Sequence, residues 1–150
     1  MAEEDTRTFL AHMRHELLTP INPIIGYSEM FLEDEEGLEP AFLEAMEAIH
    51  RRGEELLTLI GEILDKDRIQ GLGTEDLTGL SQEACRALEG PAQAIISRCD
   101  TLQQREGEED ALEEVERIRI AAQKLLSMVT NPHHWEEMAS IMGVDIPCPR

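Results

Sequence analysis

Apolar residues recur every seven positions along most of this chain, and this feature most limits the folds that it can adopt. The series are Leu10, Leu17, Ile24 and Phe31; Phe42, Ile49, Leu56 and Ile63; and Leu88, Ile95 and Leu102. Residues spaced in this way lie along one side of an α-helix and form the contact seam of a helix bundle. No stretch has the sustained alternation of a half-buried β-strand. The pattern therefore predicts an all-α protein.

Turn residues divide the chain into helices and connections. We expect helices at 8–32, from Pro40 onward, at 80–104 and at 111–130, with a short one at 134–142. Pro40 suits a first helical turn, and Asn131 with the proline after it should end the fourth helix. We interpret residues 1–150 as one domain, with a hairpin at 8–69, a linker at 70–79, a second hairpin at 80–131 and a tail at 132–150.

The two predicted hairpins resemble each other. The segment 20–25 aligns with 91–96 at an offset of 71, and each begins with a proline inside an expected helix. Residues 49–57 align with 118–126 at an offset of 69. An interior proline costs about 3 kcal/mol, so its recurrence favours duplication over chance similarity of amphipathic helices. We expect an up-down-up-down four-helix bundle made of two fused hairpins, a pseudo-dimer.

Composition excludes several classes of function. The chain has 13 Lys and Arg against 32 Asp and Glu, a net charge of −19, which argues against nucleic-acid and membrane-surface partners. Aromatic residues make up 3%, so the core should be aliphatic, and no apolar run is long enough to span a bilayer. Three cysteines without metal-like spacing suggest reduced thiols and a cytoplasmic protein.

The polar face of the first helix carries the residues of chemical interest. They follow at intervals of three or four and are His12, His15, Thr19, Asn22, Gly26 and Glu29. Pro20 and Pro23 each remove a helical N–H donor, so we expect the helix to bend just after His15 and to leave its imidazole facing solvent. Near pH 7 a large fraction of such an imidazole is neutral and can act as a nucleophile.

Residues 9–22, with the sequence FLAHMRHELLTPIN, resemble the H-box of the dimerisation and phosphoacceptor domain of sensor histidine kinases. Residues 49–69 are similar to the second helix of that domain, so the resemblance covers 8–69. It implies that His15 is the phosphorylated histidine, that Glu16 is its acid/base neighbour and that Thr19 positions water in dephosphorylation. The family usually has Arg or Lys where this chain has Leu18, so a charge contact near the phosphoryl group is missing.

The remaining members of the polar face are expected to contact a partner. Asn22 and Gly26 extend the face beyond Thr19, and His12 precedes His15 by one turn, where it either tunes the local field or is inert. The second hairpin has Arg86 at the position that corresponds to His15, and an arginine stays protonated and cannot accept a phosphoryl group. We therefore interpret the second hairpin as a degenerate copy.

Other motifs point away from autonomous kinase or metal chemistry. The sequence has no Walker-type loop and none of the Asp-x-Gly-x-Gly boxes of the histidine-kinase ATP domain, so we expect no ATP-dependent kinase activity of its own. His133 and His134 near Cys148 could suggest a metal, but adjacent histidines point apart, and we expect no metal site. Trp135 and Met138 should instead seal one end of the bundle.

The resemblance implies a phosphorelay protein in which His15 exchanges a phosphoryl group with an aspartate of a response regulator receiver domain. A histidine kinase is a further expected partner as donor, Mg²⁺ is expected to come from the regulator, and this chain should bind no cofactor itself. We expect a monomer. Three alternatives stay open: a kinase-like binding module or phosphatase that docks a regulator without carrying phosphate, a purely structural interaction bundle, and a phosphoacceptor fragment of a larger sensor kinase.

Overall fold

A computed structural model describes residues 2–33, 38–65, 77–104, 111–131 and 134–141, and every structural statement below refers to these residues. The helices are α1 (Ala2–Leu18), α2 (Ile21–Glu33), α3 (Pro40–Ile63), α5 (Leu77–Gln103), α6 (Leu112–Thr130) and α7 (His134–Ile141). The described ranges contain no strand, which confirms the all-α prediction.

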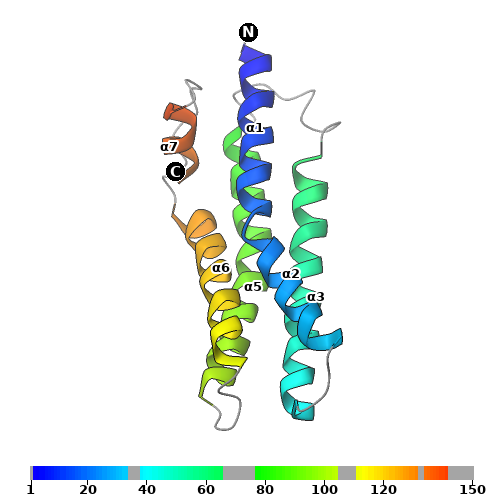
Figure 1. The fold of residues 1–150 in the computed structure, drawn as a ribbon. Helices are drawn as coiled ribbons and strands as arrows, with labels where there is room; N and C mark the ends of the chain where they lie inside the picture. The colour runs from blue at the N-terminus through cyan, green and yellow to red at the C-terminus, as the bar shows by residue number, and fades with distance from the viewer. Residues whose placement is uncertain (1, 34–37, 66–76, 105–110, 132–133, 142–150) are drawn as a thin grey trace.

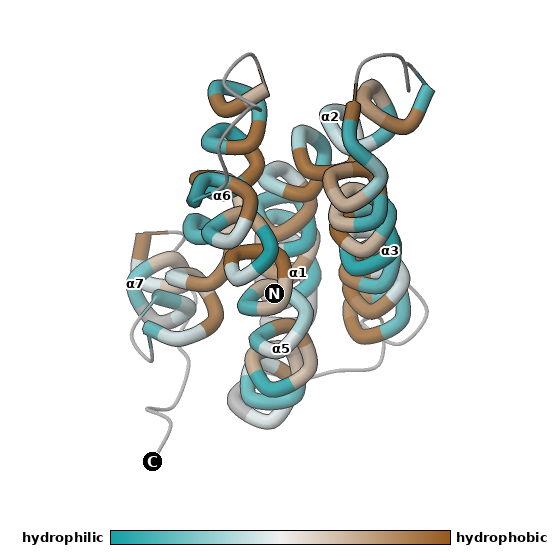
Figure 2. The backbone as a smooth tube through the Cα atoms, turned by 90° about the horizontal axis from the view of Figure 1, so that it is seen from below, coloured by the Kyte–Doolittle hydropathy of each residue, from teal (hydrophilic) through white to brown (hydrophobic). Residues whose placement is uncertain are grey.

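The long helices pack in a closed ring. α2 contacts α3 and α6, and α5 contacts α3 and α6 in turn. The helices α2, α3, α5 and α6 run alternately down and up, and α1 extends the line of α2 upward in Figure 1. Apolar backbone segments turn toward the centre of the ring in Figure 2 and polar segments turn outward. The arrangement is the predicted up-down-up-down bundle.

The predicted heptad series form the core. Leu10, Leu17, Ile24, Ile49, Leu56, Leu88 and Ile95 are each fully buried, and most of the remaining core is aliphatic. The buried aromatic rings lie at the two ends. Phe31 and Phe42 meet edge to face at the α2–α3 turn, and Phe9 and Trp135 meet at 6.2 Å between centroids near α7. Trp135 therefore closes one end of the bundle, as predicted, and aliphatic side chains fill the middle.

The first predicted helix is divided in two, which corrects the expected single helix at 8–32. α1 starts at Ala2, six residues earlier than expected, and stops at Leu18; Thr19 and Pro20 form a turn before α2. The break comes after Leu18, whereas the prolines predict a bend just after His15. Pro23 then stands in the first turn of α2, where its missing N–H costs little because first-turn N–H groups have no intrahelical partner.

Helix boundaries elsewhere differ by a few residues. α5 starts at Leu77, so the predicted linker at 70–79 is wrong for 77–79, and residues 70–76 lie outside the described ranges. α6 ends at Thr130, and the Asn131 N–H caps it by donating to the Ser127 carbonyl. Pro40 occupies the first turn of α3, as predicted.

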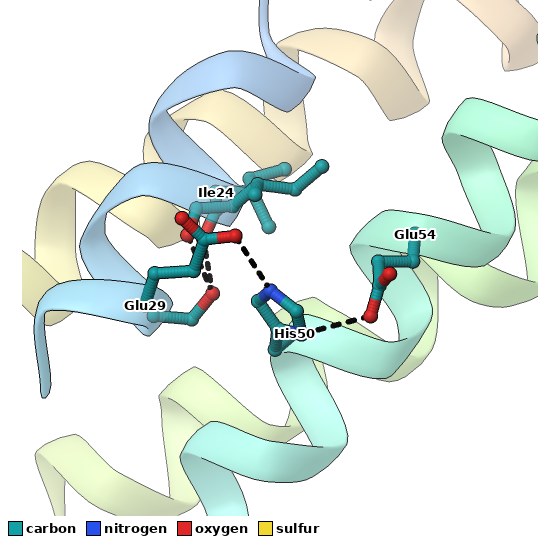
Figure 3. A network of polar contacts seen from close by, with 6 residues as sticks. Ile24, Glu29, His50 and Glu54 are labelled. Atoms are coloured by element: carbon teal, nitrogen blue, oxygen red, sulfur yellow. Dashed lines mark hydrogen bonds and ion pairs between the residues drawn. The ribbon is translucent and has the colours of Figure 1, made fainter. Parts of the chain in front are cut away.

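Polar pairs link neighbouring helices at two places. His50 of α3 contacts Glu29 of α2 at 3.1 Å and Glu54, one turn further along α3, at 3.0 Å (Figure 3). Arg119 of α6 donates from Nε to Asp100 of α5 at 2.7 Å. These pairs join α2 to α3 and α5 to α6.

Candidate functional site

His15 lies in the last turn of α1 with an exposed side chain. Its imidazole forms no hydrogen bond or ion pair with any residue that the structure describes. Met13 and Leu17, on either side of it, are fully buried and hold this turn against the core. The arrangement presents an unengaged imidazole on a fixed helix surface, as the sequence predicted.

Thr19 closes the turn that follows His15. Its backbone N–H donates to the His15 carbonyl at 3.0 Å, and its Oγ1 donates to the same carbonyl at 2.8 Å. The hydroxyl proton is thereby committed to the backbone, so the exposed Oγ1 can only accept a further hydrogen bond, for example from water. Thr19 thus stabilises the helix end that carries His15.

Glu16 faces away from its sequence neighbour. Its Oε1 lies 3.5 Å from Nε2 of His12, one turn earlier on α1, and both side chains are about one-third exposed. The part of the chain that the structure describes shows no contact between Glu16 and His15. An acid/base role for Glu16 would need another rotamer, and it stays a prediction.

Asn22 and Gly26 continue the exposed face along α2. A Cβ atom built on Gly26 would meet no heavy atom within 4 Å, so this position opens to solvent. Leu18 is half-buried and packs against the core, so no charge replaces the Arg or Lys that the family usually has there. His15, Thr19, Asn22 and Gly26 therefore lie along one accessible surface.

A groove of about 340 Å³ lies beside this surface, between α2 and α6. Thr19 and Pro20 line it from the turn before α2, Pro23 lines it from α2, and α6 contributes Ile120, which is 54% exposed. The sequence reasoning missed this groove because its two walls are about a hundred residues apart in the chain.

An arginine–tyrosine pair closes one side of this groove. Arg117 of α6 donates from Nη1 to the hydroxyl of Tyr27 on α2 at 2.8 Å, and its guanidinium carbon lies 6.0 Å from the centre of that ring. The hydrogen bond to Tyr27 is the main reason that the pKa of Arg117 is raised. Neither residue belongs to the heptad series, so only the folded structure brings them together.

The cysteines take no part in this surface. Cys99 is buried in α5, and burial raises the pKa of its thiol to about 12; burial also raises the pKa of Cys85. Both thiols are therefore protonated near neutral pH and poor nucleophiles. Cys148 and His133 lie outside the described residues.

The described ranges hold no group of three or more His, Cys, Asp or Glu side chains placed to bind a metal. None of the described helices is long and apolar enough to cross a membrane.

Comparison with known proteins identifies the class of the first hairpin. Residues 5–72 match the family described as the His Kinase A (phospho-acceptor) domain. The first hairpin is therefore similar to this phosphoacceptor domain, and the relatives of the chain include histidine kinases.

The relatives that the chain matches are much longer proteins. It is 43% identical over 63 residues to the histidine protein kinase DivJ of Caulobacter vibrioides, a match that covers 41% of this chain and 11% of DivJ. It is 32% identical over 100 residues to the non-motile and phage-resistance protein of the same organism, a match that covers 61% of this chain and 12% of that protein. It is 37% identical over 62 residues to the signal transduction histidine-protein kinase BarA of Escherichia coli, a match that covers 41% of this chain and 6% of BarA. The matched segment thus spans at most about an eighth of each of these three, and no solved structure matches the chain significantly.

Proposed function

We propose that this chain is a phosphorelay protein in which His15 accepts a phosphoryl group and exchanges it with an aspartate of a response regulator. The observation that carries the proposal is the exposed, unengaged imidazole of His15 within a segment that matches a phosphoacceptor family. The experiment below tests whether His15 accepts the phosphoryl group, whether a response regulator is its partner and whether the group is relayed.

The transfer needs little covalent chemistry from the protein. A lone pair on a neutral imidazole nitrogen of His15 forms the N–P bond while the P–O bond to the regulator's aspartate breaks and its carboxylate leaves; the reverse transfer uses the same groups. The contribution of the bundle is to hold the imidazole in one orientation, since buried Met13 and Leu17 fix its helical turn. Mg²⁺ would arrive with the regulator and neutralise charge on the phosphoryl oxygens.

The docking surface that we propose consists of His12, Asn22 and Gly26 around His15. Asn22 and Gly26 are exposed, and Gly26 leaves room for close approach of another chain. Glu16 and Thr19 lie within the same surface, Glu16 beside His12 and Thr19 at the end of α1. We propose one productive regulator for each chain, because the corresponding surface around Arg86 has no nucleophile.

We also propose that residues 80–131 are a second, degenerate copy of the first hairpin and that the chain acts as a monomer. Buried Leu17, Pro20 and Ile24 correspond at an offset of 71 to buried Leu88, Pro91 and Ile95. The polar pairs correspond as well, since Glu29 and His50 align with Asp100 and Arg119 at the offsets that the sequence gives. A closed ring built from one chain leaves no continuous apolar stripe for a second chain to cover.

Phosphotransfer with matched glutamine variants tests the proposal. Receiver domains labelled with radioactive acetyl phosphate are incubated with wild type, His15→Gln, His12→Gln or Arg86→Gln. We expect acid-labile, base-stable label on wild type, His12→Gln and Arg86→Gln, and only background on His15→Gln, with unchanged helical circular dichroism. Label on His15→Gln would move the acceptor to another histidine and contradict the proposal.

The same experiment separates the alternative of a regulator-docking phosphatase. In that case no label reaches the chain, yet phosphate is lost from the receiver domain faster when the chain is present. The hydroxyl of Thr19 can accept a hydrogen bond from the attacking water but cannot donate one while it bonds to the His15 carbonyl. Accelerated loss that survives His15→Gln and disappears in Thr19→Ala would favour the alternative.

A further inference from the structure

Three arginines face one groove between α3 and α5, away from the surface that carries His15. The groove has a volume of about 500 Å³, and its polar lining consists of Arg51, Arg52, Arg98, Ser97 and Thr101. Two alanines form the rest of its wall. The lining contains no acidic side chain.

This concentration of positive charge is unusual for the chain. It has 13 Lys and Arg in all and a net charge of −19, yet three of those 13 lie around a single groove. Scattered surface arginines would be expected to pair with the abundant carboxylates. A cluster of positive charges without acidic partners destabilises the folded state through like-charge repulsion, and an anionic ligand would relieve that repulsion.

The donors of the groove are largely unengaged. Arg52 pairs with Glu55 at 2.8 Å through Nη1, but Arg51 and Arg98 form no ion pair with any residue in the described ranges. The hydroxyl of Thr101 donates to the backbone carbonyl of Ser97 at 3.1 Å. Two complete guanidinium groups therefore remain able to donate into the groove, and their planar forks match the oxygens of a phosphate.

The spacing along the helices makes the site compact. Arg51 and Arg52 follow Ala48 by three and four residues on α3, and Ser97 and Arg98 follow Ala94 by the same intervals on α5. Along each helix the lining residues thus fall within one to two turns, about 5–10 Å. An extended acidic peptide or a nucleic acid would require charge over a longer track, whereas a small anion with several charges matches this length.

The overall negative charge does not prevent anion binding here. At an ionic strength of about 0.15 M, interactions beyond about 8 Å are largely screened, so the carboxylates that weaken the local field are the near ones, such as Glu55, which pairs with Arg52. The volume of the groove also falls within the range of small-molecule sites, about 300–1,000 Å³.

We propose that the α3–α5 groove is a binding site for a compact diphosphate group, held by Arg51, Arg52 and Arg98. The diphosphate could be inorganic pyrophosphate or part of a nucleoside diphosphate, since both present the same oxygens. This site is independent of the proposed phosphotransfer at His15.

Titration calorimetry with the full chain in 50 mM NaCl and EDTA tests this site, with inorganic pyrophosphate as the first probe. We expect Arg98→Glu to weaken binding by about tenfold or more, because it removes a charge-assisted bond and adds repulsion. The matched control is Lys124→Glu, which makes the same change of net charge in the α2–α6 groove. We expect it to weaken binding by about threefold at most.

Arms with ADP and adenosine identify the source of the diphosphate. ADP that binds as tightly as pyrophosphate indicates recognition of the diphosphate alone, and ADP that binds more tightly indicates a nucleotide; adenosine should not bind in either case. The proposal is overturned if pyrophosphate does not bind at millimolar concentration or if both variants weaken it equally. Arg98 is exposed, so circular dichroism of Arg98→Glu should match wild type.

Discussion

The two hairpins share a pattern of buried residues, but they treat proline differently. In the first, Pro20 lies in a break between α1 and α2, and Thr19 bonds twice to the His15 carbonyl. In the second, Pro91 lies inside the continuous helix α5, where Gly90 takes the position of Thr19. The broken hairpin thus has a capped helix end beside an exposed imidazole, and the continuous one has neither. A proline contributes to such a site only where a neighbouring residue caps the interrupted helix, as Thr19 does here.

Moving the histidine tests whether the surroundings matter as much as the nucleophile. In the double variant His15→Gln, Arg86→His, an imidazole occupies the corresponding exposed position of the second hairpin. We expect phosphotransfer from labelled receiver domains to stay at background, because Ala87 and Gly90 replace Glu16 and Thr19. The single variant Arg86→His should carry one phosphoryl group per chain. Restored labelling of the double variant would show that the second hairpin is a competent copy.

Proline position should also separate the hairpins in stability. Pro91 is interior to α5, so Pro91→Ala restores a backbone N–H that can bond to the Ala87 carbonyl. The substitution also loses the burial of the proline ring and increases the entropy of the unfolded chain, and both effects reduce the gain. We therefore expect the free energy of unfolding to rise by about 1–2 kcal/mol. Urea titration followed by circular dichroism measures it.

The control for this variant is Pro23→Ala in the first turn of α2. Its new N–H gains no intrahelical partner, so the expected change is within about 1 kcal/mol of zero. Equal stabilisation by both substitutions would mean that α1 and α2 join into one helix when Pro23 is removed. In that case Pro23, rather than the turn at Thr19 and Pro20, maintains the break.

The sequence predicted the bundle well because its core obeys a simple period. Leu10 and Leu17 lie seven apart in α1 and Ile49 and Leu56 lie seven apart in α3, so in each helix a packing that buries one member of the pair also buries the other. It predicted a bend just after His15 but not the break after Leu18, because two prolines close together permit several positions for it. The start of α5 differs from the prediction for a related reason: a glycine among polar residues favours a linker, but Gly79 lies within the first turn of the helix.

The candidate site could be predicted only in part. The exposure of His15 follows from its phase opposite the core seam, so its position on the surface was accessible from the sequence. The partner of Glu16 could not be predicted from the sequence, because both His12 and His15 are close enough along the helix to contact its carboxylate. In the structure the rotamer of Glu16 brings the carboxylate to His12. The arginine groove is also invisible in the sequence, since Arg52 and Arg98 are 46 positions apart and meet only when α3 lies against α5.

The polar pairs provide the smallest and most specific contrast between the hairpins. His50 and Arg119 occupy corresponding positions, but an imidazole loses its charge between about pH 5 and 8 and a guanidinium does not. The hydrogen bond to Asp100 raises the pKa of Arg119 further, so this pair stays charged. An ion pair with a histidine contributes stability at low pH, where the ring is protonated, and loses it as the pH rises.

Double-mutant cycles at two pH values measure this difference. We expect the coupling energy of Glu29 with His50, from Glu29→Gln and His50→Gln, to be about 0.5 kcal/mol at pH 5.5 and near zero at pH 8. The coupling of Asp100 with Arg119, from Asp100→Asn and Arg119→Gln, should be about 0.5–1 kcal/mol at both. Because Glu54 also contacts His50 at 3.0 Å, the first cycle is repeated with Glu54→Gln, where Glu29 is the carboxylate left beside the ring. A pH-independent coupling for His50 would show that a neutral hydrogen bond, and not charge, joins α2 to α3.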